Sequence, residues 1–432
     1  MGNRSIAFHY FGCKVNFAET SALIRQFRER GFQIRDFKEP ADVYVISTCV
    51  VTAVAEKKCR AAIRQAHKLN SDGKIAVIGC FPELSPGELE NMEGVSIVLG
   101  HTGKFSLPEA VENLFSPGDH KHPDLPAATD FIPSWSFGDR TRSFLKIQDG
   151  CDYYCSYCTI PFARGHSRSD KIENIIRNAK EFARAGIREV VLTGVNIGDF
   201  GRHNNESFLG LVQALECADC VSRIRISSIE PDLLNDEIID LVGSSGKFMP
   251  HFHIPLQSGS DMVLKLMKRK YDTELFASRI RKIRDSLPLA CIATDVMVGF
   301  PGETDANFRE THEFIEGLEL SYMHVFSYSR RENTLAAKMP EPVQDTVKKQ
   351  RSQLLQRLSE KKKKAFYLKN KGSDARVLFE GDNSDGFMHG FTENYLKVRT
   401  KFDPELVNKI VEVRLEELDG KPEFFLNSEM AK

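Results

Sequence analysis

Strand-like apolar runs alternate with amphipathic, helix-like runs along most of this 432-residue chain. Over residues 1–115, runs such as "ADVYVIST" and "KIAVIG" are separated by helical segments such as "AEKKCRAAIRQAHKLN". Over residues 140–335, six strand candidates, from "SFLKIQD" to "YMHVFSYS", are separated mostly by helical runs. This alternation predicts parallel sheets covered by helices. We therefore expect an α/β protein, with an N-terminal parallel α/β domain followed by a partial TIM-like (β/α)6 barrel.

Changes in composition indicate the domain boundaries. Residues 116–138 are rich in Pro, Gly and Asp, which is typical of a linker. Residues 338–371 carry 11 Lys or Arg against 3 Asp or Glu and predict a basic helical connector. Residues 371–432 alternate apolar and polar positions between turn residues, which predicts a small antiparallel β domain. The predicted domains are thus 1–115, 139–370 with the connector included, and 371–432.

Charge and hydropathy limit the partners and the location of the chain. The net charge is -1, so a nucleic acid would have to be met by a local basic patch. The N-terminus lacks a long apolar segment, and no run approaches the roughly 18 apolar residues of a membrane-spanning helix. We expect a cytoplasmic protein with no membrane partner. Its ten cysteines favour metal binding or catalysis over a disulfide framework.

Three cysteines are concentrated in "DGCDYYCSYC", where Cys151, Cys155 and Cys158 form a C-x3-C-x2-C pattern. One interpretation is a structural zinc site completed by Cys217 and Cys220, since such sites need four ligands. This site would require at least one barrel strand to form in the chain between the two groups of cysteines. If Cys217 and Cys220 do not bind zinc, we expect them to be packing residues near a helix end. The other interpretation is an iron–sulfur cluster held by three thiolates, which leaves one iron open.

Three further cysteines lie in separate loops of the N-terminal domain. Cys49 and Cys80 each end a predicted strand, and Cys13 lies in a strand-to-helix turn. The ends of parallel strands converge at one sheet edge, so three thiolates could meet there. The alternative is that each is a small buried hydrophobe. Packing is the role expected for Cys59, within a helix, and for Cys291, in a strand.

The C-x3-C-x2-C pattern, with Tyr157 before its last cysteine, resembles the radical S-adenosylmethionine superfamily. The resemblance implies that Cys151, Cys155 and Cys158 bind a [4Fe-4S] cluster whose open iron is chelated by S-adenosylmethionine. An electron from the cluster then cleaves the sulfonium C–S bond and yields a 5'-deoxyadenosyl radical. The residues expected to contact this cosubstrate are Tyr157, Thr193, Gly194, Asn196, Gln257 and Ser258. A plain βα turn is the alternative for the strand end "LTGVNIG".

Longer segments resemble the methylthiotransferase family over nearly the whole chain. "GCKVNFAET", "STCVVT" and "GCFPEL" are similar to its N-terminal domain, "KIQDGCDYYCSYCTIPFARG" and "HIPLQSGSD" to its barrel, and "GFTENYLKV" to its TRAM domain. The resemblance implies a second [4Fe-4S] cluster on Cys13, Cys49 and Cys80 that holds sulfur. One S-adenosylmethionine methylates this sulfur, and a second provides the radical that removes hydrogen from the substrate carbon. The implied partners are tRNA, an electron-donating reductant and a sulfur source.

The segments "GCKVN", "KIQDGC", "LTGVNIG" and "SSIEP" look most like the branch that acts on N6-threonylcarbamoyladenosine next to the tRNA anticodon. The alternatives are isopentenyladenosine in tRNA, a ribosomal protein, or, outside this chemistry, a zinc-stabilised RNA-binding protein. RNA contacts are expected from two basic sets, Lys361, Lys362, Lys363 and Lys364 in the connector, and Lys397, Arg399 and Lys401 in the C-terminal domain. Residues 373–432 carry 13 Asp or Glu against 8 Lys or Arg, so only such a local set can bind RNA there. A solvated helix face and a charged outer barrel face are the alternatives.

Three other side chains of the barrel region have two interpretations each. Arg164 either pairs with a carboxylate or lies on the surface. His251 and His253 alternate along one predicted strand, so they share a face. They line the barrel lumen or are satisfied core histidines.

Overall fold

The structure, a computed structural model, describes residues 4–49, 53–115, 130–136, 141–418 and 426–430. It divides into two compact units. The first consists of Met1–Asp139, Phe144–Tyr154 and Cys158–Asp170, and the second of Arg140–Ser143, Cys155–Tyr157 and Lys171–Lys432. Most of the predicted linker 116–138 lies outside the described residues. No helix in the described part of the chain is long and apolar enough to cross a membrane.

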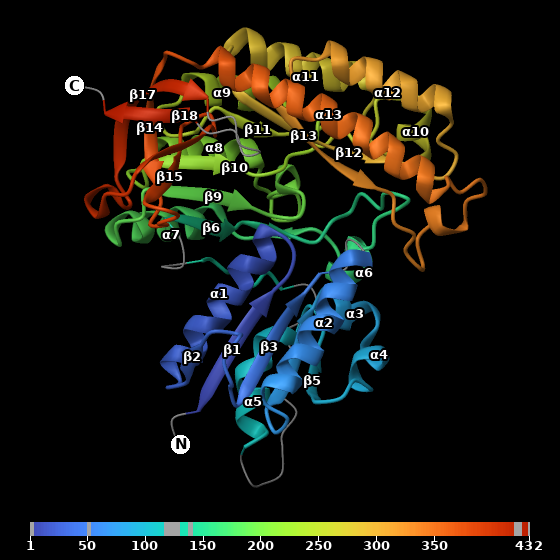
Figure 1. Cartoon of the computed structure of the whole chain (residues 1–432), viewed down its shortest axis with the longest axis vertical. Coiled ribbons are helices and arrows are strands. Elements are labelled where there is room, and N and C mark those ends of the chain that lie inside the picture. The colour runs from blue at the N-terminus through green and yellow to red at the C-terminus, as the bar shows by residue number, and fades with distance from the viewer. Residues whose placement is uncertain (1–3, 50–52, 116–129, 137–140, 419–425, 431–432) are drawn as a thin grey trace. The chain divides into compact units, whose positions relative to one another are not determined.

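The first unit is a parallel sheet with helices on its faces (Figure 1). The strands are β1 Ser5–Tyr10, β2 Gln33–Arg35, β3 Val43–Thr48, β4 Lys74–Gly79 and β5 Val95–Leu99, in the order β2-β1-β3-β4-β5. The helices are α1 Lys14–Glu29, α2 Ala53–Leu69, α3 Cys80–Leu84, α4 Pro86–Glu90, α5 Leu107–Asn113 and α6 Ile160–Arg164, and two short strands, β7 Gln148–Asp149 and β8 Arg168–Ser169, pair antiparallel. The predicted parallel α/β domain is confirmed. Strand β2 was not expected, because "QIR" is too short and too polar to stand out as a strand.

Burial on both faces explains the continuous apolar strands of this unit. All six residues of β3 are buried, as expected for a central parallel strand covered on both sides. One face packs against α2 through Ile63 and Cys59, and the other packs against α1 and α5 through Leu23, Phe27 and Leu107.

The second unit contains the predicted partial barrel. Its strands are β9 Glu189–Thr193, β10 Arg223–Ile226, β11 His251–His253, β12 Cys291–Val298 and β13 Tyr322–Ser327. The sixth strand of the barrel, β6 Arg142–Lys146, begins in this unit, and its residues from Phe144 onward belong to the first unit. These strands form two three-stranded sheets, β10-β9-β6 and β11-β12-β13, linked by parallel bridges such as that between Ser228 and His253. The helices are α7 Ile172–Arg184, α8 Phe208–Cys217, α9 Asp236–Ser244, α10 Asp261–Leu266, α11 Thr273–Ser286 and α12 Asp305–Gly317. The basic connector is helical, as predicted, over α13 Asp345–Lys369.

The C-terminal part is a small closed barrel. Strands β14 Asp374–Phe379, β15 Phe387–Phe391, β16 Lys397–Lys401, β17 Ile410–Leu418 and β18 Leu426–Met430 close in the order β14-β15-β16-β18-β17. All pairs are antiparallel, as predicted, except β16 with β18, which run parallel. Residue alternation predicts a strand but not its direction relative to a neighbour, so this pair could not be predicted from the pattern.

Candidate metal centres

Three cysteine loops of the first unit leave the sheet at the same edge. Strands β1, β3 and β4 are neighbours and run parallel. Cys13 is the N-cap residue of α1 after β1, Cys49 follows β3 directly, and Cys80 follows β4 directly. The predicted convergence of the three cysteine loops is therefore confirmed.

A glycine allows the close approach of two of these loops. Gly12 has φ +111°, and a Cβ placed on it would lie 2.8 Å from the Cys49 Cβ and 3.1 Å from its Sγ. Only glycine fits this space and this backbone conformation. The loop that carries Cys13 thus lies directly against Cys49.

Two polar side chains connect the three cysteine loops. The Asn16 amide donates to the carbonyl of Phe11, at 2.7 Å, and to that of Thr48, at 3.2 Å. The Thr48 hydroxyl donates to the Ile78 carbonyl at 2.8 Å and accepts from the Phe81 amide at 3.2 Å. The Asn16–Phe11 bond lies within the Cys13 loop, whereas the bonds of Thr48 with Asn16, Ile78 and Phe81 each join segments that carry different cysteines. Sequence reasoning missed both residues, although they occur in the segments "GCKVN" and "STC" that it singled out.

The donor set at this edge fits an iron–sulfur cluster. Cys49 and Cys80 are buried, Cys13 is exposed, and none of the three forms a disulfide. Ligands of a single tetrahedral zinc ion lie about 4 Å apart, whereas each thiolate of a cuboidal cluster binds a different iron. Among the described residues, the one set of three possible ligand atoms that all lie within 4.8 Å of one another contains no cysteine.

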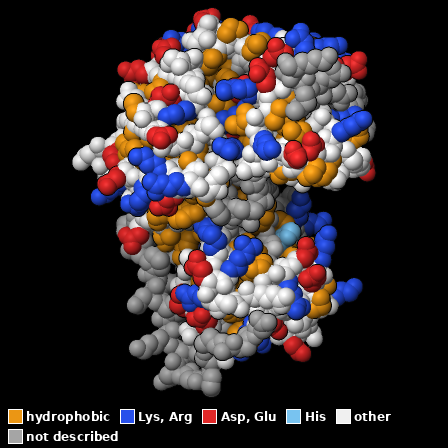
Figure 2. All heavy atoms as spheres, turned by 90° about the vertical axis from the view of Figure 1, so that its left-hand side faces the viewer, with side chains coloured by type: hydrophobic (Ala, Val, Ile, Leu, Met, Phe, Trp, Pro, Cys, Tyr) orange, Lys and Arg blue, Asp and Glu red, His pale blue; other side chains and the backbone are white. Residues whose placement is uncertain are grey.

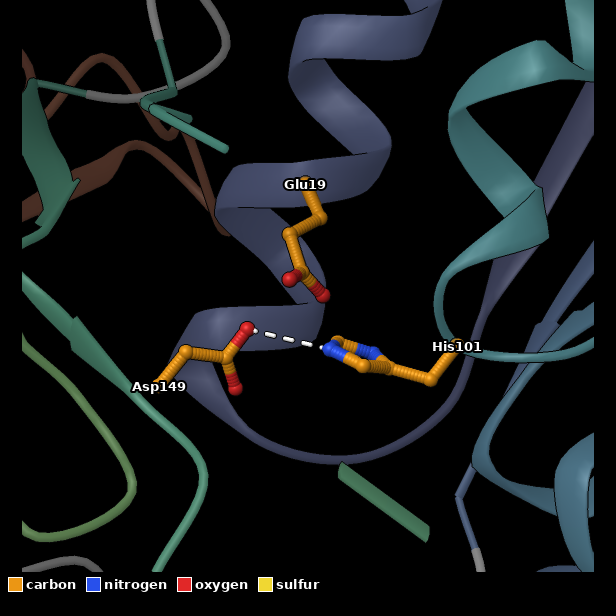
Figure 3. A group of neighbouring side chains, drawn as sticks. All are labelled: Glu19, His101 and Asp149. Carbon is orange, nitrogen blue, oxygen red and sulfur yellow. Dashed lines mark ion pairs between the residues drawn. The ribbon is translucent and has the colours of Figure 1, made fainter. Parts of the chain in front are cut away.

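That set consists of Glu19 on α1, His101 and Asp149, and Figure 3 shows how these side chains approach each other. Their carboxylates are already bound to cations. Arg164 donates to Glu19 at 3.1 Å and to Asp149 at 2.8 Å, and Lys104 and Lys146 also pair with Glu19. Although burial favours the neutral acid, these cations hold the pKa of Glu19 well below its usual range. The group is a buried ion network and not a metal site, and Arg164 pairs with carboxylates instead of lying on the surface.

Cys155 of the second cysteine group lies in a polar environment of its own unit. The Arg269 guanidinium lies 3.0 Å from the Cys155 Sγ and 3.5 Å from the Tyr157 hydroxyl, and it also pairs with Glu230. Burial raises the pKa of Glu230 to about 7, against the opposing effect of Arg269. Sequence reasoning missed Arg269, and it missed Glu230 as a site residue although it quoted "SSIEP". In the first unit, the amide of Cys151 donates to the Gly165 carbonyl.

The residues predicted to contact S-adenosylmethionine follow the carboxyl ends of barrel strands, where barrel sites gather. Thr193 ends β9, and Gly194 and Asn196 follow it. Gln257 and Ser258 follow β11, and Gln257 has a positive φ of 64°. The Ser258 hydroxyl is fully buried and lies 3.2 Å from the Thr311 hydroxyl of α12, so it holds the loop in place.

The two histidines of β11 have different neighbours. His253 lies 3.1 Å from the Asp295 carboxylate of β12. His251 packs on Tyr395 of the C-terminal barrel, with ring centroids 4.5 Å apart.

The predicted RNA-binding lysines of α13 differ in their surroundings. Lys361 and Lys364 are exposed. Lys362 is half-buried and donates to the carbonyls of Glu316 and Leu318 at the end of α12, at 3.1 and 2.7 Å. Lys363 lies over the Tyr367 ring, 5.9 Å from its centroid. The structure therefore gives Lys362 a capping role in the fold.

The second basic set follows the alternation of β16. Lys397, Arg399 and Lys401 occupy alternate positions and Val398 between them is buried, so the three share the outer face as predicted. On the face of the molecule drawn in Figure 2, basic side chains occur in small groups interspersed with acidic ones. The described side chains on this face form no broad basic field.

Of the four remaining cysteines, two are packed as expected, but the exposed Cys217 does not fit the packing expected of the 217/220 pair. Cys59 and Cys291 are fully buried in hydrophobic cores, and burial raises the pKa of each thiol to about 12. Cys217 is the exposed last residue of α8, and Cys220 is half-buried. Packing is confirmed for Cys59 and Cys291.

Comparisons with known proteins agree with this organisation. Family models match residues 5–100 (Uncharacterized protein family UPF0004), 145–315 (Radical SAM superfamily) and 368–428 (TRAM domain). The chain is similar in fold, at a TM-score of 0.52 and 13% identity, to the radical S-adenosylmethionine methyltransferase TsrM from Kitasatospora setae, over 78% of this chain and 77% of that one.

Curated relatives match over nearly the full length. The threonylcarbamoyladenosine tRNA methylthiotransferase MtaB of Bacillus subtilis is 39% identical over 95% of this chain and 93% of its own, and that of Aquifex aeolicus is 35% identical over 94% and 99%. The tRNA-2-methylthio-N(6)-dimethylallyladenosine synthase of Staphylococcus aureus is 31% identical over 96% and 84%. Radical S-adenosylmethionine enzymes use a [4Fe-4S] cluster together with S-adenosylmethionine. The chain therefore belongs to the radical S-adenosylmethionine methylthiotransferase family.

Proposed function

We propose that this enzyme converts N6-threonylcarbamoyladenosine next to the tRNA anticodon to its 2-methylthio derivative. The observation that carries the proposal is the 35–39% identity, over nearly the whole chain, to relatives named threonylcarbamoyladenosine tRNA methylthiotransferase. The relative named for the dimethylallyl base is 31% identical, which makes that base the second candidate. A tRNA substrate is consistent with the expected cytoplasmic location.

The two cysteine groups each bind one [4Fe-4S] cluster in this proposal. Cys151, Cys155 and Cys158 hold the cluster that receives S-adenosylmethionine, and Cys13, Cys49 and Cys80 hold an auxiliary cluster. When bound, these clusters supply an electron for cleavage of the sulfonium C–S bond and a sulfur atom for transfer. A reductant and a sulfur source are then required as partners.

The protein's own residues orient the ligands of both clusters. Arg269 donates to the Cys155 sulfur and would stabilise its thiolate form. Asn16 and Thr48 fix the loops that carry the auxiliary cysteines. Tyr157 and the strand-end residues Thr193, Gly194 and Asn196 are proposed to contact the cosubstrate, with Gln257 and Ser258 on the loop after β11. Lys361, Lys364 and the outer face of β16 are proposed to contact tRNA phosphates.

Cysteine substitutions test the roles of the two clusters. Cys155→Ala should abolish formation of 5'-deoxyadenosine, whereas Cys49→Ala should retain it and stop sulfur insertion. Each variant should retain about four irons per chain, against about eight in the unsubstituted enzyme. Cys217→Ala, which changes an exposed cysteine outside both groups, is the matched control. If the Cys49 variant still produces methylthiolated tRNA, the proposed role of the auxiliary cluster in sulfur insertion is wrong.

Nucleoside analysis tests the substrate. A strain that lacks its own methylthiotransferases would be complemented with this chain, and its tRNA digested and examined by mass spectrometry. We expect 2-methylthio-N6-threonylcarbamoyladenosine to appear. If only the methylthiolated isopentenyl base appears, the threonylcarbamoyl assignment is wrong and the second candidate holds.

A further inference from the structure

The buried ion network of the first unit contains more cations than carboxylates. Two carboxylates, Glu19 and Asp149, face Lys104, Lys146 and Arg164, and all five side chains are at most 2% exposed. Lys104 and Lys146 lie 2.5 and 2.9 Å from the Glu19 oxygens. Arg164 bridges the two carboxylates, at 3.1 Å from Glu19 and 2.8 Å from Asp149.

His101 is the sixth buried member of the network, and it does not offset the excess of cations over carboxylates. Burial lowers its pKa to about 4, so the ring is neutral near pH 7. Arg168, 11% exposed, adds another cation 3.3 Å from Asp149. A surplus positive charge at a buried position is costly unless a negative group lies nearby.

The surplus charge lies beside the auxiliary cysteines. Arg164 ends α6, which packs against α3, the helix that begins at Cys80. Ala163 and Cys80 belong to the same core cluster. The Arg164 guanidinium lies close enough to Cys80 and Cys13 to interact electrostatically with both. A cuboidal cluster with three thiolate ligands carries net negative charge and would balance the network.

We propose that Arg164 is a positioning residue whose buried positive charge neutralises the auxiliary cluster on Cys13, Cys49 and Cys80, with Glu19 and Asp149 holding its guanidinium in place. The inference rests on the auxiliary cluster of the proposed function. Reduction adds one negative charge to the cluster, so a fixed cation stabilises the reduced state more than the oxidised state. Arg164 therefore raises the reduction potential of this cluster.

The test uses the full-length chain with Cys151, Cys155 and Cys158 replaced by Ala, so that only the auxiliary cluster forms. Its midpoint potential is measured by a redox titration followed by EPR, together with iron content and thermal stability. Arg164→Met should lower the ratio of reduced to oxidised cluster at a fixed potential about tenfold, the effect of one unit charge across a partly buried gap. That change corresponds to a midpoint about 59 mV more negative.

Two further variants in the same background separate charge from structure. Glu19→Gln removes a negative charge with little change of shape, so it should shift the midpoint in the opposite direction. Arg164→Lys keeps the positive charge, so its midpoint potential should lie closer to that of the protein with Arg164 than to that of Arg164→Met. The matched control is Arg225→Met, which removes a buried arginine paired with Glu189 in the other unit and should leave the potential unchanged.

The outcomes distinguish the inference from its premise. If the triple cysteine variant binds no cluster before any change at Arg164, the proposed auxiliary cluster fails. If the cluster forms but Arg164→Met and Glu19→Gln leave its potential unchanged, or shift it in the same direction, the network is structural only and the inference is overturned. If Arg164→Met does not fold, the sign of the Glu19→Gln shift decides.

Discussion

His101 is a single residue whose protonation should affect the stability of the first unit. Its Nδ1 lies 3.0 Å from the Lys104 ammonium, which can only donate, so this nitrogen carries a lone pair in the folded state. Burial is the main cause that lowers its pKa to about 4, and the ordinary value is 6.5. The unfolded state therefore takes up a proton below pH 6.5 that the folded state does not accept until about pH 4.

We expect His101 to destabilise the protein progressively as the pH falls from 6.5 towards 4. At pH 5 the free energy of unfolding should be lower by about 2 kcal/mol, because this pH lies roughly 1.5 units below the unfolded pKa and each unit corresponds to about 1.4 kcal/mol. Urea unfolding at pH 7 and pH 5 measures this difference in the free energy of unfolding. In His101→Gln this part of the pH dependence should be missing, and an unchanged difference between the two pH values would contradict the argument.

Asn16 is a second residue with a specific expected effect. Asn16→Ala leaves the carbonyls of Phe11 and Thr48 without its amide, which should cost about 1–3 kcal/mol and reduce the iron bound by the auxiliary cysteines. Asn70→Ala, which removes a similar bond to the Ala41 carbonyl, is the control. We expect it to lower stability while the iron content stays normal. Equal iron loss in both variants would mean that Asn16 has no specific role at the cysteine loops.

At the scale of single residues, sequence patterns indicated the two cysteine groups but not the side chains that surround them. A three-cysteine spacing and the position of Cys49 and Cys80 at strand ends are local patterns. The partners of Glu19, Lys104 and Arg164 are distant in sequence, and no local pattern connects them. Arg164 illustrates the limit, since pairing with a carboxylate and surface exposure remained equally open until the structure showed Glu19 and Asp149 beside it.

Helix α13 is an element in which neighbouring lysines have different roles. Lys361→Ala with Lys364→Ala should weaken tRNA binding and reduce the slope of log affinity against log salt by about 0.7–0.9 for each phosphate that the protein no longer neutralises. Stability should hardly change, because the Lys361 pair with Glu316 is an exposed one at 3.7 Å.

Lys362→Ala provides the comparison within the same helix. It removes two hydrogen bonds to the end of α12, so it should cost about 1–2 kcal/mol in unfolding free energy. The salt slope of tRNA binding should stay as in the unsubstituted protein. Filter binding at several salt concentrations and urea unfolding measure the two effects. If the double variant binds tRNA normally, the exposed lysines are only a solvated helix face.

For the molecule as a whole, periodicity predicted the architecture of the sheets well, but it does not show which distant segments pack into one compact unit. The six barrel strands and the C-terminal sheet follow from buried runs and alternation, because these patterns reflect burial on one or two faces. The predicted site segments "KIQDGC" and "FARG" belong to the compact unit of the N-terminal sheet, although the sequence prediction assigned them to the barrel domain. Compactness depends on long-range packing, which a local pattern does not contain.

Arg225 allows a prediction about how the two barrels of the second unit are held together. Its buried guanidinium pairs with Glu189 at 2.7 Å and donates to the carbonyls of Thr392 and Glu393, which lie between β15 and β16. Arg225→Met leaves the Glu189 carboxylate buried without this cation, which should cost about 3–5 kcal/mol. Two hydrogen bonds to the C-terminal barrel are removed as well. We therefore expect the substitution to accelerate hydrogen exchange more in β14–β17 than in β12.

The exposed pair of Arg376 with Glu393 on the same barrel is the matched control. Arg376→Met removes a largely exposed ion pair, which is worth at most about 1 kcal/mol, so hydrogen exchange in β14–β17 should change little. Hydrogen exchange followed by mass spectrometry compares both variants in the full chain. If Arg225→Met accelerates exchange equally in all strands of the second unit, the arginine stabilises the unit as a whole and does not specifically hold the C-terminal barrel to it.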